Sequence, residues 1–158
     1  PTIGSLMYAM VTTRPDIAHT VGVAADLCTI PADRIEMQLS IVQMLVGTKD
    51  HGILFGPNKN SGVVGYTDSD FAGCVDNRKS TTEYCFKFGN GEISWKSKLQ
   101  ECTTTSTNIT EYVTASDAAK EALWLNRMAH MFRQVDSYSA PVVYCDSQGV
   151  VSLSKNSV

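Results

Sequence analysis

The pattern of apolar residues changes near residue 50, and this change constrains the fold more than any other feature. Before it, apolar residues recur at helical spacing, and Pro15 and Pro31 stand where helices can begin. Beyond it, short β-branched and aromatic runs are separated by glycine and asparagine, as in antiparallel strands. We therefore expect a helical segment over residues 1–50 and a strand-rich domain over residues 51–158.

The same patterns place the individual elements. Helices are predicted over residues 3–11, 15–27, 31–47, 108–133 and 147–155. Strands are predicted over residues 53–55, 63–66, 84–88, 93–95 and 141–145, with a hairpin turn at residues 89–91. Strands first, and then helix, strand and helix, predict an α/β (α+β) fold with a mixed sheet flanked by helices.

Composition excludes several function classes. The net charge of −3 argues against a free-standing, tight nucleic-acid binder, because neutralising phosphates supplies most of the affinity of such proteins. The five cysteines include no C-x-x-C pair, which indicates reduced intracellular thiols rather than disulfides or a zinc site. Cys85 and Cys145 lie inside apolar strands and are expected to be buried rather than reactive. No run reaches the roughly 18 apolar residues of a membrane span, and no membrane partner is expected.

Two acids end apolar strands. Asp68 follows residues 63–67, and Asp146 follows residues 142–145. In open sheets, catalytic and metal-binding groups commonly lie at the carboxyl ends of strands. Each acid also has a simpler interpretation, a solvated turn for Asp68 and a helix N-cap or first-turn acid for Asp146.

Glu111 is a third acid of interest, and it lies in the long helix. On a helical wheel it falls at the rim of the predicted buried face, which consists of Tyr112, Ala115, Ala119, Ala122 and Leu123. The opposite, solvated face is predicted to hold Thr110, Thr114, Asp117 and Glu121. An alternative that can also hold is a capping box, with Asn108 as N-cap and Glu111 three residues on.

Asp68, Glu111 and Asp146 can converge at one place. Gathered carboxylates repel one another unless cations lie among them, and oxygen ligands suit Mg²⁺ or Mn²⁺. Two such ions, about 3.5–4 Å apart, can clamp the attacking and leaving oxygens in phosphodiester hydrolysis. The three acids therefore predict a site for two ions.

Five ordered motifs around these acids resemble the ribonuclease H of copia-type retrotransposons. They are residues 65–73 (GYTDSDFAG), 78–82 (RKSTT), 93–98 (ISWKSK), 111–112 with 119–125 (EY and AKEALWL), and 144–147 (YCDS). Upstream, residues 4–8 (GSLMY) and 13–18 (TRPDIA) resemble the segment that joins the reverse transcriptase of that family to its ribonuclease H. The resemblance covers nearly the whole chain and implies a ribonuclease H-like sheet behind the end of a reverse transcriptase.

The resemblance implies a function for the three acids. It implies that two Mg²⁺ or Mn²⁺ ions are bound by Asp68, Glu111 and Asp146. The implied activity is endonucleolytic cutting of the RNA strand of an RNA–DNA hybrid, within a Pol polyprotein whose reverse transcriptase lies upstream. The implied location is the cytoplasm, in virus-like particles, with the nucleus as a further location.

The sequence also departs from the family pattern. The family usually has glycine at the position of Glu83 and an acid at the position of Ile109. The resemblance further implies a strand and a helix beyond Val158, carrying a histidine and a fourth metal-binding acid. Residues 1–158 do not include them, so we expect a ribonuclease H-like domain that is incomplete at its C-terminus and cuts little or not at all by itself. The alternative function is a decayed or domesticated fold that binds nucleic acid or protein without cutting.

A locally basic segment runs from residue 78 to residue 98, with five basic residues and two acids. Trp95 and Tyr84 are interleaved with them, a composition suited to the phosphates and sugars of a hybrid. The residues expected to bind nucleic acid are Arg78, Lys79, Lys96 and Lys98. A solvated hairpin edge, whose lysines prevent aggregation, explains the same pattern equally well.

Some apolar side chains of residues 1–50 are expected to lack cover, because the reverse transcriptase against which they would pack is absent from this chain. These side chains are Leu6, Met10, Val21, Leu39 and Val42.

Overall fold

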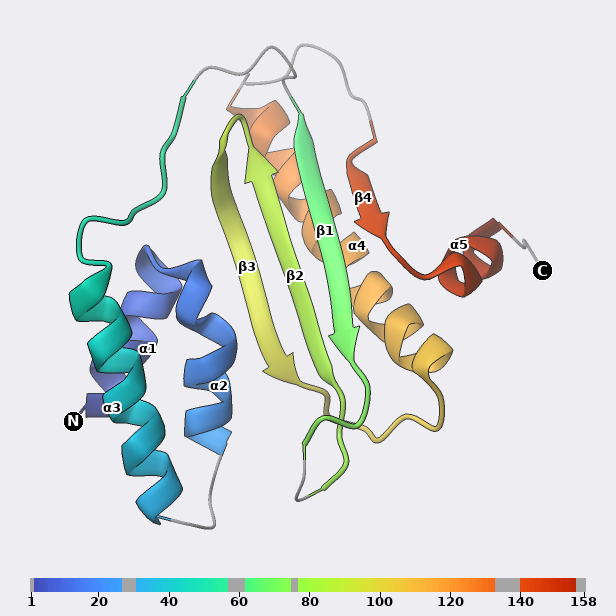
Figure 1. The fold of residues 1–158 in the computed structure, drawn as a ribbon. Coiled ribbons are helices and arrows are strands. Elements are labelled where there is room, and N and C mark those ends of the chain that lie inside the picture. Colours follow the sequence, from blue (N-terminus) through green and yellow to red (C-terminus); the bar gives the residue numbers. More distant parts are fainter. Residues whose placement is uncertain (1, 27–30, 57–61, 75–76, 133–139, 156–158) are drawn as a thin grey trace. The chain divides into compact units, whose positions relative to one another are not determined.

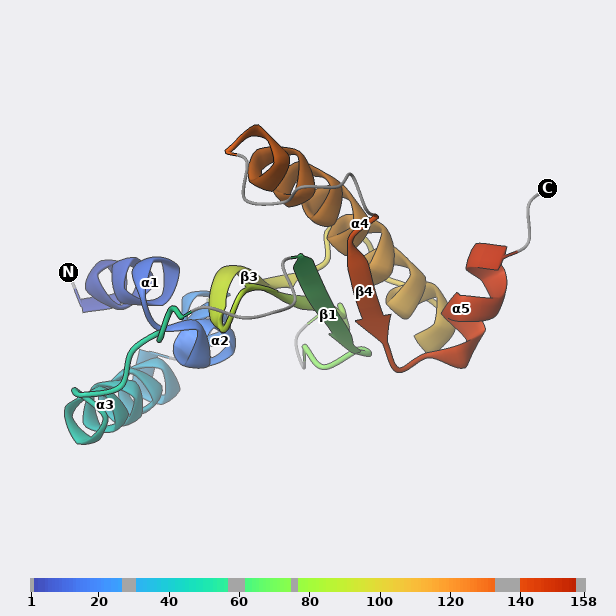
Figure 2. The ribbon, with the colours of Figure 1, turned by 90° about the horizontal axis from the view of Figure 1, so that it is seen from above.

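The computed structural model describes residues 2–26, 31–56, 62–74, 77–132 and 140–155. The chain divides into two compact units, Pro1–Ile53 and Leu54–Val158. Their helices and strands are labelled in Figures 1 and 2. The division falls close to the boundary near residue 50 that the sequence pattern suggests.

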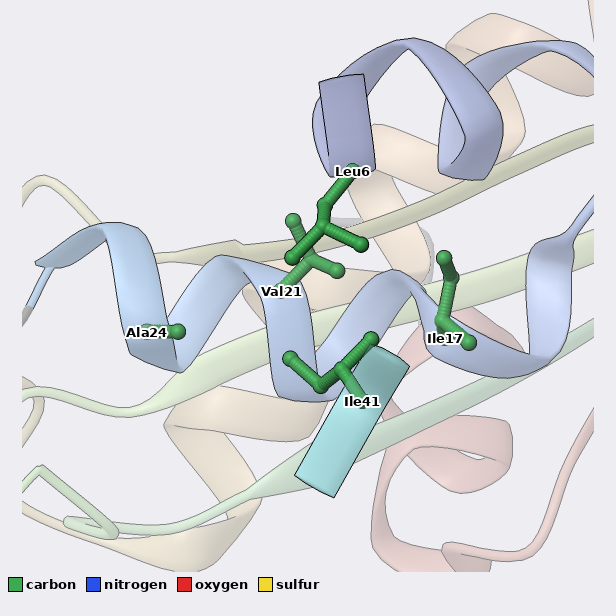
Figure 3. Packing of buried hydrophobic residues seen from close by; sticks show 5 residues of the cluster. All are labelled: Leu6, Ile17, Val21, Ala24 and Ile41. Carbon is green, nitrogen blue, oxygen red and sulfur yellow. The ribbon is translucent and has the colours of Figure 1, made fainter. Parts of the chain in front are cut away.

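The first unit consists of helices around a small apolar core. Its elements are α1 (Thr2–Thr12), the 3-10 helix η1 (Pro15–Ile17), α2 (Ala18–Asp26) and α3 (Pro31–Gly47). The predicted helices are thus confirmed within the described residues, with the second one divided into η1 and α2. Pro15 begins η1, where its missing N–H leaves no hydrogen bond unmade. The core residues, shown in Figure 3, are Leu6, Ile17, Val21, Ala24 and Ile41.

The expectation of uncovered apolar faces in this unit is wrong for two side chains. Leu6 is 4% exposed and Val21 is 0% exposed, because α1, α2 and α3 enclose a core of their own. Met10 and Val42 are partly buried against that core. Leu39 is exposed, as expected.

Arg14 connects η1 to the end of α3. Its guanidinium donates hydrogen bonds to Asp16 Oδ2 (2.6 Å) and to Thr48 Oγ1 (2.7 Å), and a third to the Thr48 carbonyl (3.2 Å). The hydrogen bond with Asp16 raises the pKa of Arg14 and lowers the pKa of Asp16.

The second unit is built on a four-stranded mixed sheet in the order β3-β2-β1-β4. The strands are β1 (Val63–Asp70), β2 (Thr81–Phe88), β3 (Gly91–Leu99) and β4 (Val142–Cys145). β2 pairs antiparallel with β1 and with β3, whereas β4 pairs parallel with β1. Two helices complete the unit, α4 (Thr107–Met131) and α5 (Gln148–Lys155), and α4 runs along one face of the sheet (Figures 1 and 2). This architecture is the predicted mixed sheet flanked by helices, and it is compatible with a ribonuclease H-like fold.

The strand predicted at residues 53–55 is wrong. Residues 51–56 have no regular secondary structure. The ring of Phe55 lies against Gly91, where an added Cβ would come within 2.4 Å of Phe55 Cδ1. The aromatic residue of this run therefore packs over the β2–β3 hairpin instead of pairing in the sheet.

The predicted hairpin at residues 89–91 is confirmed. Phe88 pairs with Gly91, which leaves Gly89 and Asn90 as the turn. Gly89 has φ of +63°, a left-handed conformation that glycine adopts at little cost.

One face of α4 packs on the sheet, but it is not the face predicted from the wheel. The buried residues are Thr110, Thr114, Ala118, Ala122, Leu125 and Asn126. Ala118 and Ala122 pack against Phe86, which is fully buried at the centre of the core. Of the residues expected to be buried, Tyr112 and Leu123 are half exposed.

Two acids predicted to be solvated on α4 instead contact the edge strand β3. Asp117 accepts a hydrogen bond from Lys96 Nζ (3.2 Å). Glu121 accepts one from Ser94 Oγ (2.6 Å). Around the circumference of α4, the side that faces the sheet therefore lies between Glu111 and these two acids.

The buried threonines of α4 belong to a hydrogen-bonded network with polar residues from other segments. The Thr114 hydroxyl bonds with that of Thr82 (3.1 Å), and Gln100 Nε2 donates to Thr82 Oγ1 (3.0 Å). The Thr110 hydroxyl bonds with those of Ser80 (3.2 Å) and Thr104. Because these hydroxyls have partners, their burial carries little of the penalty of an unsatisfied polar group.

Ser106 is the N-cap of α4, and its Oγ accepts a hydrogen bond from the Ile109 N–H (3.3 Å). The predicted capping box with Asn108 as N-cap is therefore wrong. Asn108 instead lies against Gly149 of α5, where an added Cβ would come within 2.9 Å of Asn108 Oδ1. Glu111 is not required for capping. None of the helices in the described ranges combines the length and apolarity needed to cross a membrane.

Candidate metal centre

Asp68 and Asp146 occupy matching positions on adjacent parallel strands. β1 and β4 pair from Val64 with Val142 to Thr67 with Cys145, and each acid is the residue that follows. The sequence pattern suggested that Asp68 ends its strand. This prediction is wrong, because β1 continues beside β2 to Asp70. Both acids nevertheless lie where the pairing with β4 ends.

Glu111 reaches the same region from α4. One carboxylate oxygen of Glu111, one of Asp146, and the Sγ of Cys145 all lie within 4.8 Å of one another. The structure thus brings two of the three predicted acids to within a distance that one ion can bridge. Asp68 is not part of this close set, but its negative charge contributes to raising the pKa of Glu111.

The surroundings of Glu111 favour a nearby cation. Burial raises the pKa of Glu111 most, the charges of Asp146 and Asp68 raise it further, and the nearby Ser69 side chain opposes the rise. Glu111 Oε2 and Ser69 Oγ are both buried and have no hydrogen-bond partner among the described residues. A buried carboxylate oxygen without a partner is costly unless a proton or a cation meets it.

The donor set fits a divalent ion. Carboxylate oxygens are the ligands that Mg²⁺ and Mn²⁺ prefer, and Asp68, Glu111 and Asp146 could supply them. The orphaned Oε2 of Glu111 is the observation that most directly supports this fit.

The simpler interpretations of the strand-end acids can also be compared with the structure. Ser147 Oγ, not Asp146, accepts the N–H of Val150 (3.4 Å) at the start of α5, so the N-cap interpretation of Asp146 is wrong. Asp68 is exposed, and its Oδ1 accepts the N–H of Ser69 (2.8 Å). This local contact occupies Oδ1 of Asp68.

The four predicted nucleic-acid-binding residues lie at one end of the β2–β3 hairpin or along β3. Arg78 and Lys79 precede β2, whose first residues pair with the last of β3, including Thr82 with Lys98. Arg78 and Lys98 are exposed. Lys96 is held by Asp117 (3.2 Å) and lies 5.7 Å from the centre of the Tyr84 ring.

The departure at Glu83 has a structural consequence. Glu83 lies in β2 opposite Asp68 and Ser97, and its Oε1 accepts a hydrogen bond from Ser97 Oγ (2.7 Å). This hydrogen bond ties Glu83 to the edge strand β3. The residue that replaces the usual glycine thus has a partner of its own.

Cys145 is the residue of the site that sequence reasoning missed. Its position inside an apolar strand indicated burial, but it is only partly buried and lies within the acidic group. The signal was its place beside Asp146, at the end of a strand that pairs parallel with β1. Reading that signal needs the pairing, which one sequence does not supply.

Comparisons with known proteins give several relatives. The chain is 47% identical over 158 residues to the retrovirus-related Pol polyprotein from transposon TNT 1-94 of Nicotiana tabacum, a match covering 99% of the chain and 12% of the polyprotein. It is 32% identical over 158 residues to the corresponding polyprotein from transposon RE2 of Arabidopsis thaliana, of which it covers 11%. It is 39% identical over 124 residues to the secreted RxLR effector protein 161 of Plasmopara viticola, a match covering 78% of the chain and 87% of that protein. The chain thus spans about an eighth of the length of the polyproteins it matches. No family model and no solved structure matches it.

Proposed function

Because this chain is similar over 99% of its length to retrovirus-related Pol polyproteins of plant transposons, we propose that its second unit is a ribonuclease H-type endonuclease module. Its reaction is hydrolysis of the RNA strand of an RNA–DNA hybrid. The first unit is the end of the reverse transcriptase, which is the upstream partner in the polyprotein. The observation that carries the proposal is the convergence of Glu111 and Asp146 beside the parallel strand pair that positions Asp68.

In this proposal Asp68, Glu111 and Asp146 hold two Mg²⁺ or Mn²⁺ ions. When bound, such ions stabilise the negative charge on the attacking and leaving oxygens of a phosphodiester. The chain contributes placement. Asp68 and Asp146 are fixed by the pairing of β1 with β4, and Glu111 is fixed by the packing of α4 on the sheet.

The buried network at the start of α4 supports that placement. Thr110 and Thr114, one and three residues from Glu111, are bonded to Ser80 and Thr82 beside the sheet. These bonds resist rotation or sliding of the first turns of α4. Glu111 is therefore presented from a rigid element, which a site requiring accurate ligand positions needs.

Substrate binding is proposed for the basic residues at the open end of the β2–β3 hairpin, opposite its turn. Arg78 and Lys98 are exposed to approaching phosphates, and Lys79 follows Arg78 in the chain. Lys96 contributes less, because Asp117 already neutralises its charge. With a net charge of −3, the chain depends on its neighbours in the polyprotein for much of its affinity.

The test is cleavage of a labelled RNA–DNA hybrid, with Mg²⁺, with Mn²⁺ and without metal. The chain is assayed together with the sequence that flanks it in its reading frame. We expect metal-dependent cutting of the RNA strand that Asp68→Asn and Glu111→Gln each abolish. Glu121→Gln is the matched control, because it makes the same change on the same helix and keeps an acceptor for Ser94. Cleavage that survives Glu111→Gln contradicts the proposed site.

A second candidate is a non-catalytic fold that binds nucleic acid or protein. The observation that favours it is the effector relative, in which this segment makes up most of a protein that is named for another role. The same assay separates the two candidates when a binding measurement is added. Binding of the hybrid without cutting in either metal supports the second candidate.

A further inference from the structure

We infer that Cys145 is a ligand of the metal centre and makes that centre selective for thiophilic divalent ions, such as Zn²⁺ and Cd²⁺, over Mg²⁺. The inference rests on the proposed function, because it concerns the same site. It goes beyond that function by predicting which ions bind most tightly and would block the site.

The fold aims Cys145 at Glu111. Side chains alternate across a strand, so Cys145 points to the same side of the sheet as Val143. Val143 packs against the core that α4 covers. Glu111 lies on α4, and the Sγ of Cys145 is within 4.8 Å of a carboxylate oxygen of Glu111 and of one of Asp146.

These separations suit a single ion. Zinc bonds to sulfur at about 2.3 Å and to carboxylate oxygen at about 2.0–2.2 Å, so ligand atoms around one tetrahedral ion are separated by about 3.5 Å. Side-chain movements of about 1 Å bring ligand atoms that lie within 4.8 Å of one another to that spacing. Glu111 Oε2 is buried, and the nearby Ser69 side chain is the polar group from which it would move away.

The mixed donor set decides the preference. Carboxylate oxygens accept Mg²⁺, Mn²⁺ or Zn²⁺, whereas a thiolate favours the softer ions. Mg²⁺ keeps water in place of sulfur, so Cys145 adds nothing to its affinity. When Zn²⁺ or Cd²⁺ binds, the Cys145 thiol gives up its proton to water, and the sulfur–metal bond forms in its place.

Two other described cysteines provide internal controls. Cys102 is exposed near Glu101, before α4 begins. Cys85 is in β2, where burial raises the pKa of its thiol most and the nearby Glu92 raises it further. Neither thiol belongs to the group of ligand atoms formed by Glu111, Cys145 and Asp146.

The experiment measures alkylation of each cysteine in the intact chain by iodoacetamide, with peptide mass spectrometry as the readout. We expect Cd²⁺ and Zn²⁺ to slow the alkylation of Cys145 at least tenfold and Mg²⁺ to slow it less than twofold. Cys102 should react at the same rate throughout. Glu111→Gln should remove most of the protection of Cys145 by Cd²⁺ and Zn²⁺. Glu121→Gln should leave that protection unchanged.

A spectroscopic measurement adds a second readout. Cd²⁺ bound by a thiolate gives an ultraviolet charge-transfer band, which Cys145→Ser should abolish and Cys102→Ser should retain. The inference is overturned if Cys145 reacts equally fast with and without Cd²⁺, or if Mg²⁺ protects it as well as Cd²⁺ does. Hybrid cleavage in Mg²⁺ is scored separately. If the hybrid is cleaved but no metal protects Cys145 from alkylation, only this inference is wrong. If Cd²⁺ protects Cys145 but the hybrid is not cleaved in any metal, only the proposed endonuclease activity is wrong.

Discussion

Gly65 in β1 is a position where one added methyl group should destabilise the second unit. Gly65 pairs with Phe86 of β2, and a Cβ added at Gly65 would lie 2.3 Å from Phe86 Cε1. Favourable contacts between carbon atoms are about 3.5–4.0 Å, so the ring must move by about 1 Å or more. Gly65→Ala therefore tests how tightly the sheet and α4 enclose Phe86.

The magnitude follows from the burial of Phe86, which is completely enclosed and packed against Ala118 and Ala122 of α4. Overpacking a core costs about 1–3 kcal/mol. We expect a value near the upper end, because β1 is held by β2 and β4 on both sides. Replacing a glycine in a strand recovers roughly 0.5–1 kcal/mol of backbone entropy. The net loss in the free energy of unfolding should be about 2 kcal/mol.

Urea unfolding followed by tryptophan fluorescence is the appropriate assay. Both tryptophans of the chain, Trp95 in β3 and Trp124 in α4, belong to the second unit, so the signal reports that unit. With a urea dependence of about 1–3 kcal/mol per molar, the midpoint should fall by about 1 M. Gly4→Ala is the control, because nothing lies within 4 Å of its added Cβ and it belongs to the first unit.

A second substitution identifies the contact responsible. Phe86→Leu removes the ring atoms that the new methyl group meets, so the double variant should lose less stability than the sum of the two single losses. The reasoning is refuted if Gly65→Ala unfolds at the wild-type midpoint, or if the two losses simply add.

Three further predictions concern other parts of the chain. Thr114→Val should lower the stability of the second unit by about 1–2 kcal/mol in the same fluorescence assay, because it removes a partner from a buried network. The hydrogen bond from Arg14 lowers the pKa of Asp16, so its stabilisation is present above the unfolded carboxyl pKa of about 3.9 and is lost as the pH falls through the folded value. Asp16→Asn should therefore cost less than about 1 kcal/mol at neutral pH and nothing below both pKa values, measured by amide hydrogen exchange near the end of α3. Lys98→Gln should weaken hybrid binding and reduce its salt dependence by about one counterion, whereas Lys96→Gln should do less because Asp117 already pairs with Lys96.

Local sequence patterns were sufficient for most of the elements and for part of the site. Prolines, glycines and apolar spacing located the helices of the first unit, the β2–β3 hairpin and α4, because each pattern acts over a few neighbouring residues. The position of Asp146 after an apolar strand indicated a strand-end acid, and β4 ends at Cys145 as expected. These features depend on backbone preferences that a short segment carries by itself.

Features that depend on distant partners could not be predicted in this way. Thr110 and Thr114 were assigned to the solvated face of α4, but they are fully buried, because Ser80, Thr82 and Gln100 supply their hydrogen bonds. Hydropathy treats a threonine as polar and cannot register a partner about 30 residues away in the chain. Phe55 was assigned to a strand because it belongs to a short apolar run. Its ring instead packs over Gly91, which the sequence pattern does not show.

The candidate metal centre combines both kinds of information. Its acids are recognisable one at a time, two of them after apolar runs of the sequence and one on a predicted helix. Their convergence, the orphaned oxygen of Glu111 and the presence of Cys145 among them arise only when β4 pairs parallel with β1 and α4 crosses the pair. Sequence determines which ligands the chain can offer, because donor chemistry belongs to single residues. The tertiary structure decides which of them share an ion, because that depends on distances between segments remote in the chain.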